Sequence, residues 1–260
     1  MITCYTVDVF IGPGLAGNAA GVCLLPSFPA AQTMQEIAAK NGYSQTAFVV
    51  QTDSSEFQLR WYTPILEDDL CGHATLASAF VLKCVGQQAW PVRFHTRSGI
   101  LEVSCDNGSL ELGLPIWRPR RIAPPDQLLS ALRLRTAEVH RTRDFLVVVE
   151  SADIVRSAKP ALDVLRELEP SLGGVILTAA GEDDIDYVVR FFAPAVGIDE
   201  DPVSGSAACT HAPYWAQRLA KNTLQVRQLS ARGGAMRCRL DDQLVHVAGE
   251  AVIAKIGRVA

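Results

Sequence analysis

An internal repeat, spaced by about half the chain, constrains what this sequence can fold into. Each copy places an arginine before two aromatic residues, at Arg60 and Arg190, an offset of 190 − 60 = 130. Each copy then reaches a turn of small residues, Cys71-Gly72-His73 in the first and Ser204-Gly205-Ser206 in the second, an offset of 204 − 71 = 133. A third match pairs 97–99 with 232–234, an offset of 135. The repeat predicts two related halves facing each other, with a site between them.

The composition is that of a globular chain long enough for two domains. The 260 residues are 48% hydrophobic and carry a net charge of −4, which supports a sizeable core in each half. Nucleic acid is not an expected partner, because no long basic block is present. The cluster Arg118, Arg120 and Arg121 is interpreted as a solvated linker, with a polyanion site as the alternative.

The lack of a recognisable secretion signal and the cysteine usage together predict a cytoplasmic protein. The sequence shows neither a secretion signal nor an apolar stretch as long as a membrane span, so no membrane partner is expected. The seven cysteines are odd in number and lack zinc-site spacing, which favours free thiols and no metal.

Hydrophobic periodicity predicts halves rich in strands, each with one buried helix. A helix is expected over 32–41, ended by Gly42, and a mostly apolar one over 72–85. Its counterpart is expected to begin near Ser204, with Pro213 perturbing its first turns. A curved sheet wrapped around it would bury such a helix. Strands are expected near 2–10, 46–50, 57–62, 92–96, 99–105, 109–113, 144–149, 174–178, 187–192, 224–229, 235–240 and 244–256. Four prolines make 114–125 the linker, which predicts domains over 1–117 and 118–260.

The two turns are the candidate chemical sites. Helix N-termini present unpaired backbone N–H groups and the positive end of the helix dipole, and glycine lets a ligand approach the backbone. Two such ends would hold a carboxylate and stabilise developing negative charge. The alternative is that Gly72 and Gly205 only satisfy turn geometry. Cys71 is either a proton acceptor with a lowered pKa or a spectator thiol, and Asp201 either caps a helix or acts as an acid or base.

Seven segments, in one order over nearly the whole chain, resemble the PhzF-like family of phenazine-biosynthesis isomerases, within the diaminopimelate epimerase fold. They are 7–10, 17–22, 44–49, 69–75, 190–194, 201–207 and 230–234. The resemblance implies an α+β fold of two pseudo-symmetric domains, each a mostly antiparallel, barrel-like sheet around a central helix. It also implies cofactor-free proton transfer on a small carboxylate-bearing metabolite, a site in the cleft between the domains, and a homodimer.

The resemblance also assigns site residues. His73 and Asp201 correspond to substrate-site residues with catalytic roles, and the helix-end turns to Gly72, Gly205 and Ser206. Substrate contacts are further expected from four other residues: Asn18, Cys71, Ser204 and Arg232.

One position departs from the family pattern. The family's general acid/base is a glutamate, and Gln45 stands there in this chain. A carboxamide can only hydrogen-bond, whereas a carboxylate can accept a proton and return it. Three explanations are open: another base is used, with Asp201, His73 and Cys71 as candidates; the protein binds a ligand without turning it over; or the sequence is an engineered inactive variant.

Overall fold

The computed structural model describes residues 1–106, 108–168 and 173–259, and the chain forms two units. Unit 1 comprises Met1–Leu114 together with His246–Ala260, and unit 2 comprises Pro115–Val245. The expected boundary at 117/118 lies close to the observed switch, but the expected C-terminal domain is wrong in its last part. The final strand pairs along the first strand of the chain, from Ile2↔Val259 to Ile11↔Glu250, so it belongs to unit 1.

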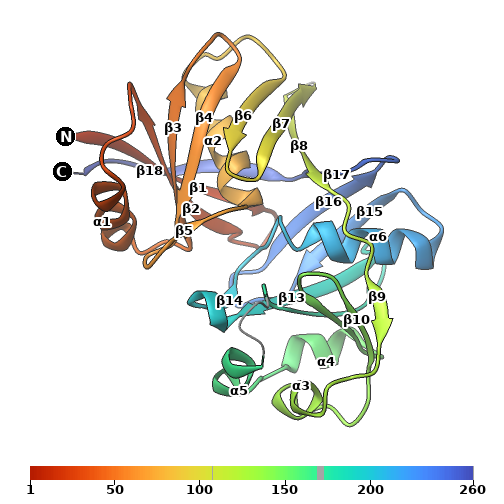
Figure 1. Cartoon of the computed structure of the whole chain (residues 1–260). Coiled ribbons are helices and arrows are strands. Elements are labelled where there is room, and N and C mark those ends of the chain that lie inside the picture. The colour runs from red at the N-terminus through yellow and green to blue at the C-terminus, as the bar shows by residue number, and fades with distance from the viewer. Residues whose placement is uncertain (107, 169–172, 260) are drawn as a thin grey trace. The chain divides into compact units, whose positions relative to one another are not determined.

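Unit 1 is a mixed sheet with one helix on each face (Figure 1). Its elements are β1 (Ile2–Ile11), β2 (Asn18–Leu25), α1 (Ala31–Asn41), β3 (Gln45–Gln51), β4 (Glu56–Tyr62), β5 (Glu67–Asp68), α2 (Gly72–Cys84), β6 (Val92–Thr96), β7 (Gly99–Asp106), β8 (Ser109–Pro115) and β18 (Glu250–Val259). Helix α2 packs against β1, β2, β3 and β18 and is buried along almost its whole length. Because α1 covers the other face with Met34 and Ile37, β3 is buried on both sides and reads as a continuous apolar run.

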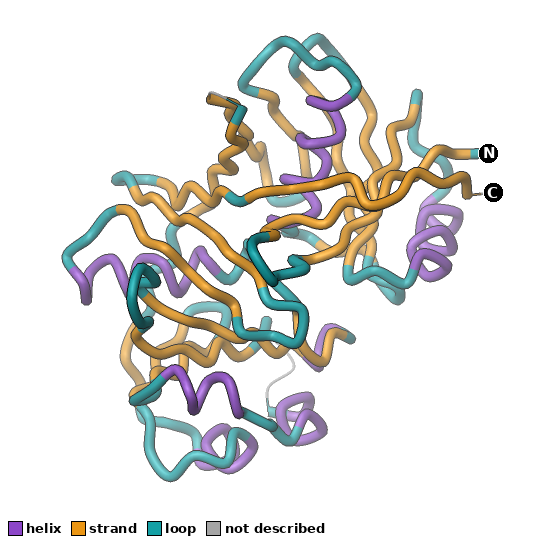
Figure 2. Tube along the Cα trace, turned by 180° about the vertical axis from the view of Figure 1, so that it is seen from behind, coloured by secondary structure: helices purple, strands orange, loops and turns teal. Residues whose placement is uncertain are grey.

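Unit 2 repeats this plan with more helices on its outer face. Its elements are β9 (Arg120–Ile122), α3 (Asp126–Ala131), β10 (Glu138–Arg141), β11 (Phe145–Val148), α4 (Ala152–Ser157), α5 (Leu162–Glu167), β12 (Val175–Ala180), β13 (Tyr187–Ala193), a 3-10 turn (Pro194–Val196), β14 (Ile198–Asp201), α6 (Ala208–Leu219), β15 (Thr223–Gln228) and β16 (Gly234–Leu240); β17 (Leu244–Ala248) then leads back to unit 1. Figures 1 and 2 both show α3, α4 and α5 together on one face of this sheet. Helix α6 packs against β15 and β16.

The sequence repeat corresponds to a repeated pattern of strand pairing. In unit 1, β2–β3 is parallel, β3–β4 antiparallel and β4–β6 parallel. In unit 2, β11–β12, β12–β13 and β13–β15 follow the same order. The repeated arginines are structural in both copies: Arg60 forms a two-pronged ion pair with Glu67, and Arg190 does so with Glu200. Each ion pair links a long strand to the short strand, β5 or β14, that precedes a helix-end turn.

The helices follow local sequence, with one correction. Gly42 ends α1 in the left-handed conformation at φ 68°, as the sequence predicts. Helix α6 begins at Ala208 rather than near Ser204, because 205–207 form a turn before it. Pro213 lies inside α6 and cannot donate to the carbonyl of Cys209, which instead accepts a hydrogen bond from the Trp117 N–H at 2.8 Å.

Other expectations hold at the level of elements. The strand expected over 244–256 is two strands, β17 and β18, interrupted after Ala248. All seven cysteines are free. Across the described residues, none of the helices has the length and apolar character needed to cross a membrane.

Candidate active site

In unit 1 the N-terminus of α2 has no side-chain cap. Cys71 is the N-cap residue, in extended conformation, and its side chain makes no capping hydrogen bond. The first N–H groups of a helix have no partner within the helix. Within the described ranges the N–H groups of Gly72 and His73 have no acceptor, so the predicted turn presents two donors together with the positive end of the helix dipole. This is a geometry suited to a carboxylate.

Four side chains form a hydrogen-bonded chain next to this turn. Ser44 Oγ donates to Asn18 Oδ1 at 3.1 Å and lies 3.2 Å from His73 Nε2. The other ring nitrogen of His73, Nδ1, lies 3.5 Å from Cys71 Sγ. Because the Ser44 proton is used on Asn18, Ser44 Oγ accepts from the Nε2–H of His73, and Nδ1 accepts from the thiol. The structure thus links three expected site residues: Ser44 joins Asn18 to His73, and His73 contacts Cys71.

Burial keeps His73 neutral. His73 is a buried residue, and this burial lowers the pKa of its imidazole to about 3. At neutral pH the imidazole is a weak base with both nitrogens in hydrogen bonds. The geometry therefore gives His73 a positioning part, as a neutral donor and acceptor that fixes Ser44 and Cys71.

Asn18 joins this chain of hydrogen bonds because the backbone before it, at Gly17, passes close to the backbone of Val9. Gly17 precedes it with φ 65°, and a Cβ at that position would lie 2.2 Å from the carbonyl oxygen of Val9. Only glycine fits such a contact. The following residue, Asn18, starts β2 opposite Val9 and is itself buried.

Gln45, at the position of the family's base, contacts a carboxylate. Its Nε2 donates to Asp68 Oδ2 at 2.6 Å. An ionised carboxylate only accepts hydrogen bonds, so the NH₂ group of the Gln45 side chain faces Asp68 and its Oε1 points away from Asp68. That Oε1 is buried and has no hydrogen-bond partner among the described residues. The second oxygen of Asp68 accepts from the backbone N–H groups of Asp69 and Leu70 at 2.8 and 3.4 Å.

Strand register explains why Gln45 and Asp68 meet. Asp68 lies opposite Trp61 in the β4–β5 pair, and Trp61 lies opposite Ala47 in the β3–β4 pair. Directly opposed residues share a face, as do residues two apart in one strand. Asp68 and Gln45 are therefore on the same face of the sheet.

Unit 2 carries the equivalent turn. Asp201 ends β14 and is buried, and Ser204 Oγ accepts from the Ala207 N–H at 3.3 Å and lies 3.3 Å from Ser206 Oγ. In the part of the chain described, the backbone N–H groups of Gly205 and Ser206 donate to no acceptor. Ser204 thus caps the turn that precedes α6, and two unpaired donors remain.

A buried glutamine holds this turn in place. Gln228 Nε2 donates to the carbonyl of Asp201 at 2.6 Å, and Gln228 Oε1 accepts from the Ser204 N–H at 3.0 Å. Ser230 Oγ donates to the carbonyl of Pro202 at 2.7 Å. In unit 1, Ser98 Oγ makes a similar bond to the carbonyl of Asp69 at 2.6 Å. Arg232 is exposed on the loop after Ser230, and its expected substrate contact stays a prediction.

Each unit has a carboxylate at the equivalent strand position near its turn. Asp201 lies opposite Phe191 in the β13–β14 pair, as Asp68 lies opposite Trp61. The offsets are 191 − 61 = 130 and 201 − 68 = 133, those of the repeat. Sequence reasoning missed Asp68, Ser44 and Gln228 as site residues. The repeat offset contained the signal for Asp68, whereas no local pattern marks Gln228.

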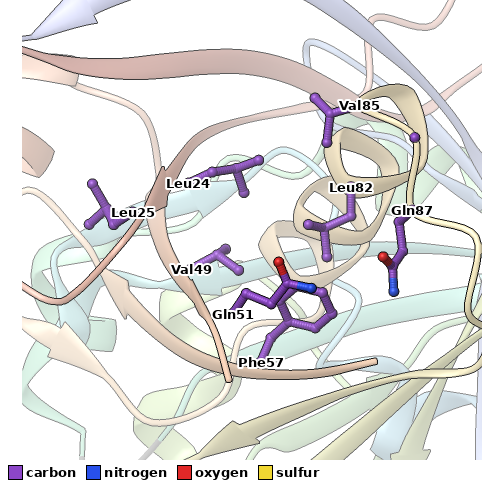
Figure 3. A pocket seen from close by; sticks show the side chains of 9 residues that line it. Leu24, Leu25, Val49, Gln51, Phe57, Leu82, Val85 and Gln87 are labelled. Carbon is purple, nitrogen blue, oxygen red and sulfur yellow. The ribbon is translucent and has the colours of Figure 1, made fainter. Parts of the chain in front are cut away.

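A separate apolar cavity in unit 1 lies away from this site. It has a volume of about 350 Å³ and is lined by Leu24, Leu25, Val49, Gln51, Phe57, Leu82, Val85, Gly86 and Gln87. Figure 3 shows Leu24, Val49 and Leu82 around the hollow between the strands and α2. It is at the C-terminal end of α2, roughly 20 Å along the helix from Cys71 at the usual helical rise. No group of three or more His, Cys, Asp or Glu side chains within the described ranges is placed to hold a metal ion.

Comparisons with known proteins establish the family. The family model described as phenazine biosynthesis-like protein matches residues 7–257. The chain is 43% identical over 257 residues to an uncharacterized isomerase of Pseudomonas aeruginosa, with 98% of each covered. A crystal structure of a PhzF-family phenazine biosynthesis protein from Enterococcus faecalis matches with a TM-score of 0.92 at 37% identity, covering 100% of this chain and 99% of that one. This chain therefore belongs to the PhzF family of phenazine biosynthesis-like proteins.

The fold extends beyond the family. A probable proline racemase from Agrobacterium radiobacter matches with a TM-score of 0.67 at 12% identity, over 100% of this chain and 93% of that one. At that identity the match concerns architecture alone. It confirms the diaminopimelate epimerase-like fold that the resemblance implied.

Proposed function

We propose that this chain is a cofactor-independent isomerase that moves a proton on a small carboxylate-bearing metabolite. The observation that carries the proposal is the duplicated half-site. Each unit has a helix-end turn with unpaired N–H groups and, at the equivalent strand position, a carboxylate: Asp68 in unit 1 and Asp201 in unit 2. The names of relatives, which include isomerases, support the same reaction class.

In this proposal the two aspartates carry out the two steps of one proton transfer. One aspartate removes a proton from carbon and becomes a carboxylic acid, while the other, protonated at the start, returns a proton to another face or carbon. The electron pair left on carbon delocalises into the substrate carboxylate. The N–H groups near Gly72, Gly205 and Ser206 stabilise the added negative charge. The proton count balances within the enzyme–substrate complex.

The remaining residues position the substrate. The unpaired Oε1 of Gln45 accepts an N–H or O–H of the substrate, which directs the proposal toward amino- or hydroxy-substituted carboxylates. Gln45 also holds Asp68 by its Nε2. Neutral His73 orders Ser44 and Cys71, and Asn18 and Arg232 line the substrate. Asp68 thus supplies the carboxylate that the family's glutamate supplies at position 45.

A deuterium-exchange screen tests the proposal. Small amino-, hydroxy- and cyclic carboxylates are incubated with the protein in deuterated water, and incorporation at carbon is followed by NMR. Wild type is expected to exchange one hydrogen of a matching compound, and Asp68→Asn is expected to abolish this. Exchange that is unchanged in both Asp68→Asn and Asp201→Asn would rule out the two-carboxylate proposal.

The second candidate is a binding protein on the same scaffold, and the carboxamide at Gln45 favours it. Such a protein binds a small carboxylate without exchange. Binding by calorimetry in the absence of deuterium incorporation, with Gln45→Glu gaining incorporation, would support it over the isomerase. The expected homodimer stays a prediction for either function.

A further inference from the structure

Unit 2 has a polar cavity on the C-terminal half of α6. Its volume is about 330 Å³, and it is lined by Arg118, Pro119, Glu138, His140, Pro213, Tyr214, Gln217 and Arg218. Helix α6 carries the turn Ser204–Ser206 before its other end, so the cavity and the candidate active site lie at different ends of one helix. None of the cavity residues takes part in the proposed reaction.

Glu138 is an internal counter-charge that orders this cavity. Its Oε1 accepts from the Tyr214 hydroxyl at 3.1 Å and lies 2.7 Å from His140 Nε2, and its Oε2 accepts from Arg218 Nη1 at 3.1 Å. Arg218 Nη1 also donates to the Tyr214 hydroxyl at 2.5 Å. Burial, together with the charge of Glu138, raises the pKa of Tyr214 to about 12, so the phenol keeps its proton. The carboxylate is therefore satisfied by groups of the chain itself.

Several donors around the cavity remain unused. Arg218 makes both of its hydrogen bonds through Nη1, which leaves its Nη2 and Nε without hydrogen-bond partners in the described chain, although the guanidinium lies over the rings of Tyr214 and Trp215. Arg118 is exposed and, among the residues described, forms neither an ion pair nor a side-chain hydrogen bond. His140 Nδ1 is buried and has no hydrogen-bond partner there either. Arg118 and Arg218 face the single carboxylate of Glu138, which pairs with Arg218, so one positive charge is left in excess.

The neighbouring strand adds a further positive charge on the same face. Arg121 of β9 lies directly opposite His140 of β10, and directly opposed residues share a face of the sheet. Arg120 lies opposite Arg141 and therefore points to the other face. The basic cluster interpreted from sequence as a linker is thus divided: Arg118 and Arg121 belong to the side of the cavity, and Arg120 does not.

One part of the cavity wall is formed by apolar rings. Pro119 and Pro213 are rings without N–H donors, and the Tyr214 ring packs edge-on against the His140 ring with 5.0 Å between centroids. A cavity of this size fits a small molecule rather than a polymer chain. Guanidinium groups recognise planar carboxylates and phosphates through paired N–H donors.

We propose that this cavity binds a small ring-bearing oxyanion, a carboxylate or phosphate ester whose charge meets Arg118 and Arg218 and whose ring packs between Pro119, Pro213 and Tyr214. The oxyanion is the recognised chemistry, and the ring supplies apolar contact. Since the site lies beside the C-terminal half of α6, its occupant is separate from the substrate of the helix-end turns.

Calorimetric titration with phenyl phosphate, benzoate and phenol tests the proposal. Binding of at least one anion at millimolar concentration or tighter, and not of neutral phenol, is expected; the stronger of the two anions identifies phosphate or carboxylate. Arg118→Gln is expected to weaken that binding about tenfold, the loss of one charged contact. Arg120→Gln, on the opposite face and with the same loss of charge, is the matched control and should leave affinity unchanged.

Two results would overturn the proposal. One is the absence of anion binding to wild type, and the other is equal weakening by Arg118→Gln and Arg120→Gln, which indicates a diffuse charge effect. Because Arg118 is exposed and forms neither an ion pair nor a side-chain hydrogen bond with the described residues, its variant is expected to fold as the wild type does, and circular dichroism checks this. Neither result depends on the proposed isomerase activity.

Discussion

Gln45 Nε2 donates a hydrogen bond to Asp68 Oδ2 at 2.6 Å, so a carboxylate stands one side chain away from the position where the family has its base. The pair consists of a carboxamide that cannot take a proton and a carboxylate that can. Asp68 is also the repeat counterpart of Asp201. In the proposed reaction Asp68 therefore takes the part of the glutamate that position 45 lacks.

Exchanging the two side chains tests this relationship. The proposal expects Asp68→Asn to lower hydrogen exchange by about a hundredfold or more, the usual contribution of a general base. The double variant Gln45→Glu/Asp68→Asn restores a carboxylate within the same pair and is expected to recover part of the rate. Gln45→Glu alone places two carboxylates in contact, which disfavours ionisation of both. Exposed Asp69, changed to Asn, is the control, and exchange rates by NMR are the measurement.

Asp201→Asn tests the second half-site. The change keeps size and removes proton transfer, so turnover is expected to fall to the background rate while the thermal midpoint stays within a few degrees. The backbone carbonyl of Asp201, which Gln228 binds, is unaffected by this substitution. A turnover rate equal to that of wild type would show that Asp201 has no catalytic role.

Gln228→Leu tests the residue that holds the second turn. It leaves the carbonyl of Asp201 and the N–H of Ser204 buried without their partner, and each such loss costs about 1–3 kcal/mol. The free energy of unfolding, measured by urea titration, is expected to fall by about 2–4 kcal/mol in all. Gln225→Leu, at an exposed position of the same strand, serves as the comparison and should change stability by much less. Equal effects of the two variants would contradict the role given to Gln228.

The lowered pKa values of two buried histidines predict that the protein loses stability in mild acid. Burial lowers the pKa of His73 and of His211 to about 3, from an ordinary value of 6.5. The unfolded chain therefore binds protons below pH 6.5 that the folded chain does not, and stability falls as pH drops from 6.5 toward 3. By linkage each histidine costs about 2 kcal/mol near pH 5.

Asp144 acts in the opposite direction and does not cancel this effect. Burial raises its pKa to about 6 from 3.8, so its folded form binds the extra proton and gains about 1 kcal/mol between pH 6 and 5. The net change from pH 6.5 to 5 is a loss. His211→Asn keeps a polar group near the hydroxyl of Tyr187, which His211 Nδ1 contacts at 2.7 Å, and is expected to roughly halve the histidine contribution. Urea titrations at several pH values measure this, and an unchanged slope would contradict it.

Prediction from sequence succeeded where the signal was local or repeated. Helix 72–85, the glycine stop at Gly42 and the family motifs each depend on residues close in the chain, and the structure and the comparisons confirm them. Local sequence predicts the start of α6 too early, because a capping serine at the beginning of a turn resembles one at the beginning of a helix. The last strand was assigned to the wrong unit because its partner, β1, is at the other end of the chain.

What the sequence determined by itself is the duplicated plan: two strand-rich halves, two small-residue turns, and a carboxamide at position 45. These follow from spacing, composition and order, which are properties of neighbouring residues. Only the tertiary structure decided that Gln45 meets Asp68, that His73 is a buried neutral imidazole between Ser44 and Cys71, and that Gln228 holds the second turn. The reason is physical: such contacts depend on strand register and burial, which place residues far apart in sequence on one face and remove them from water.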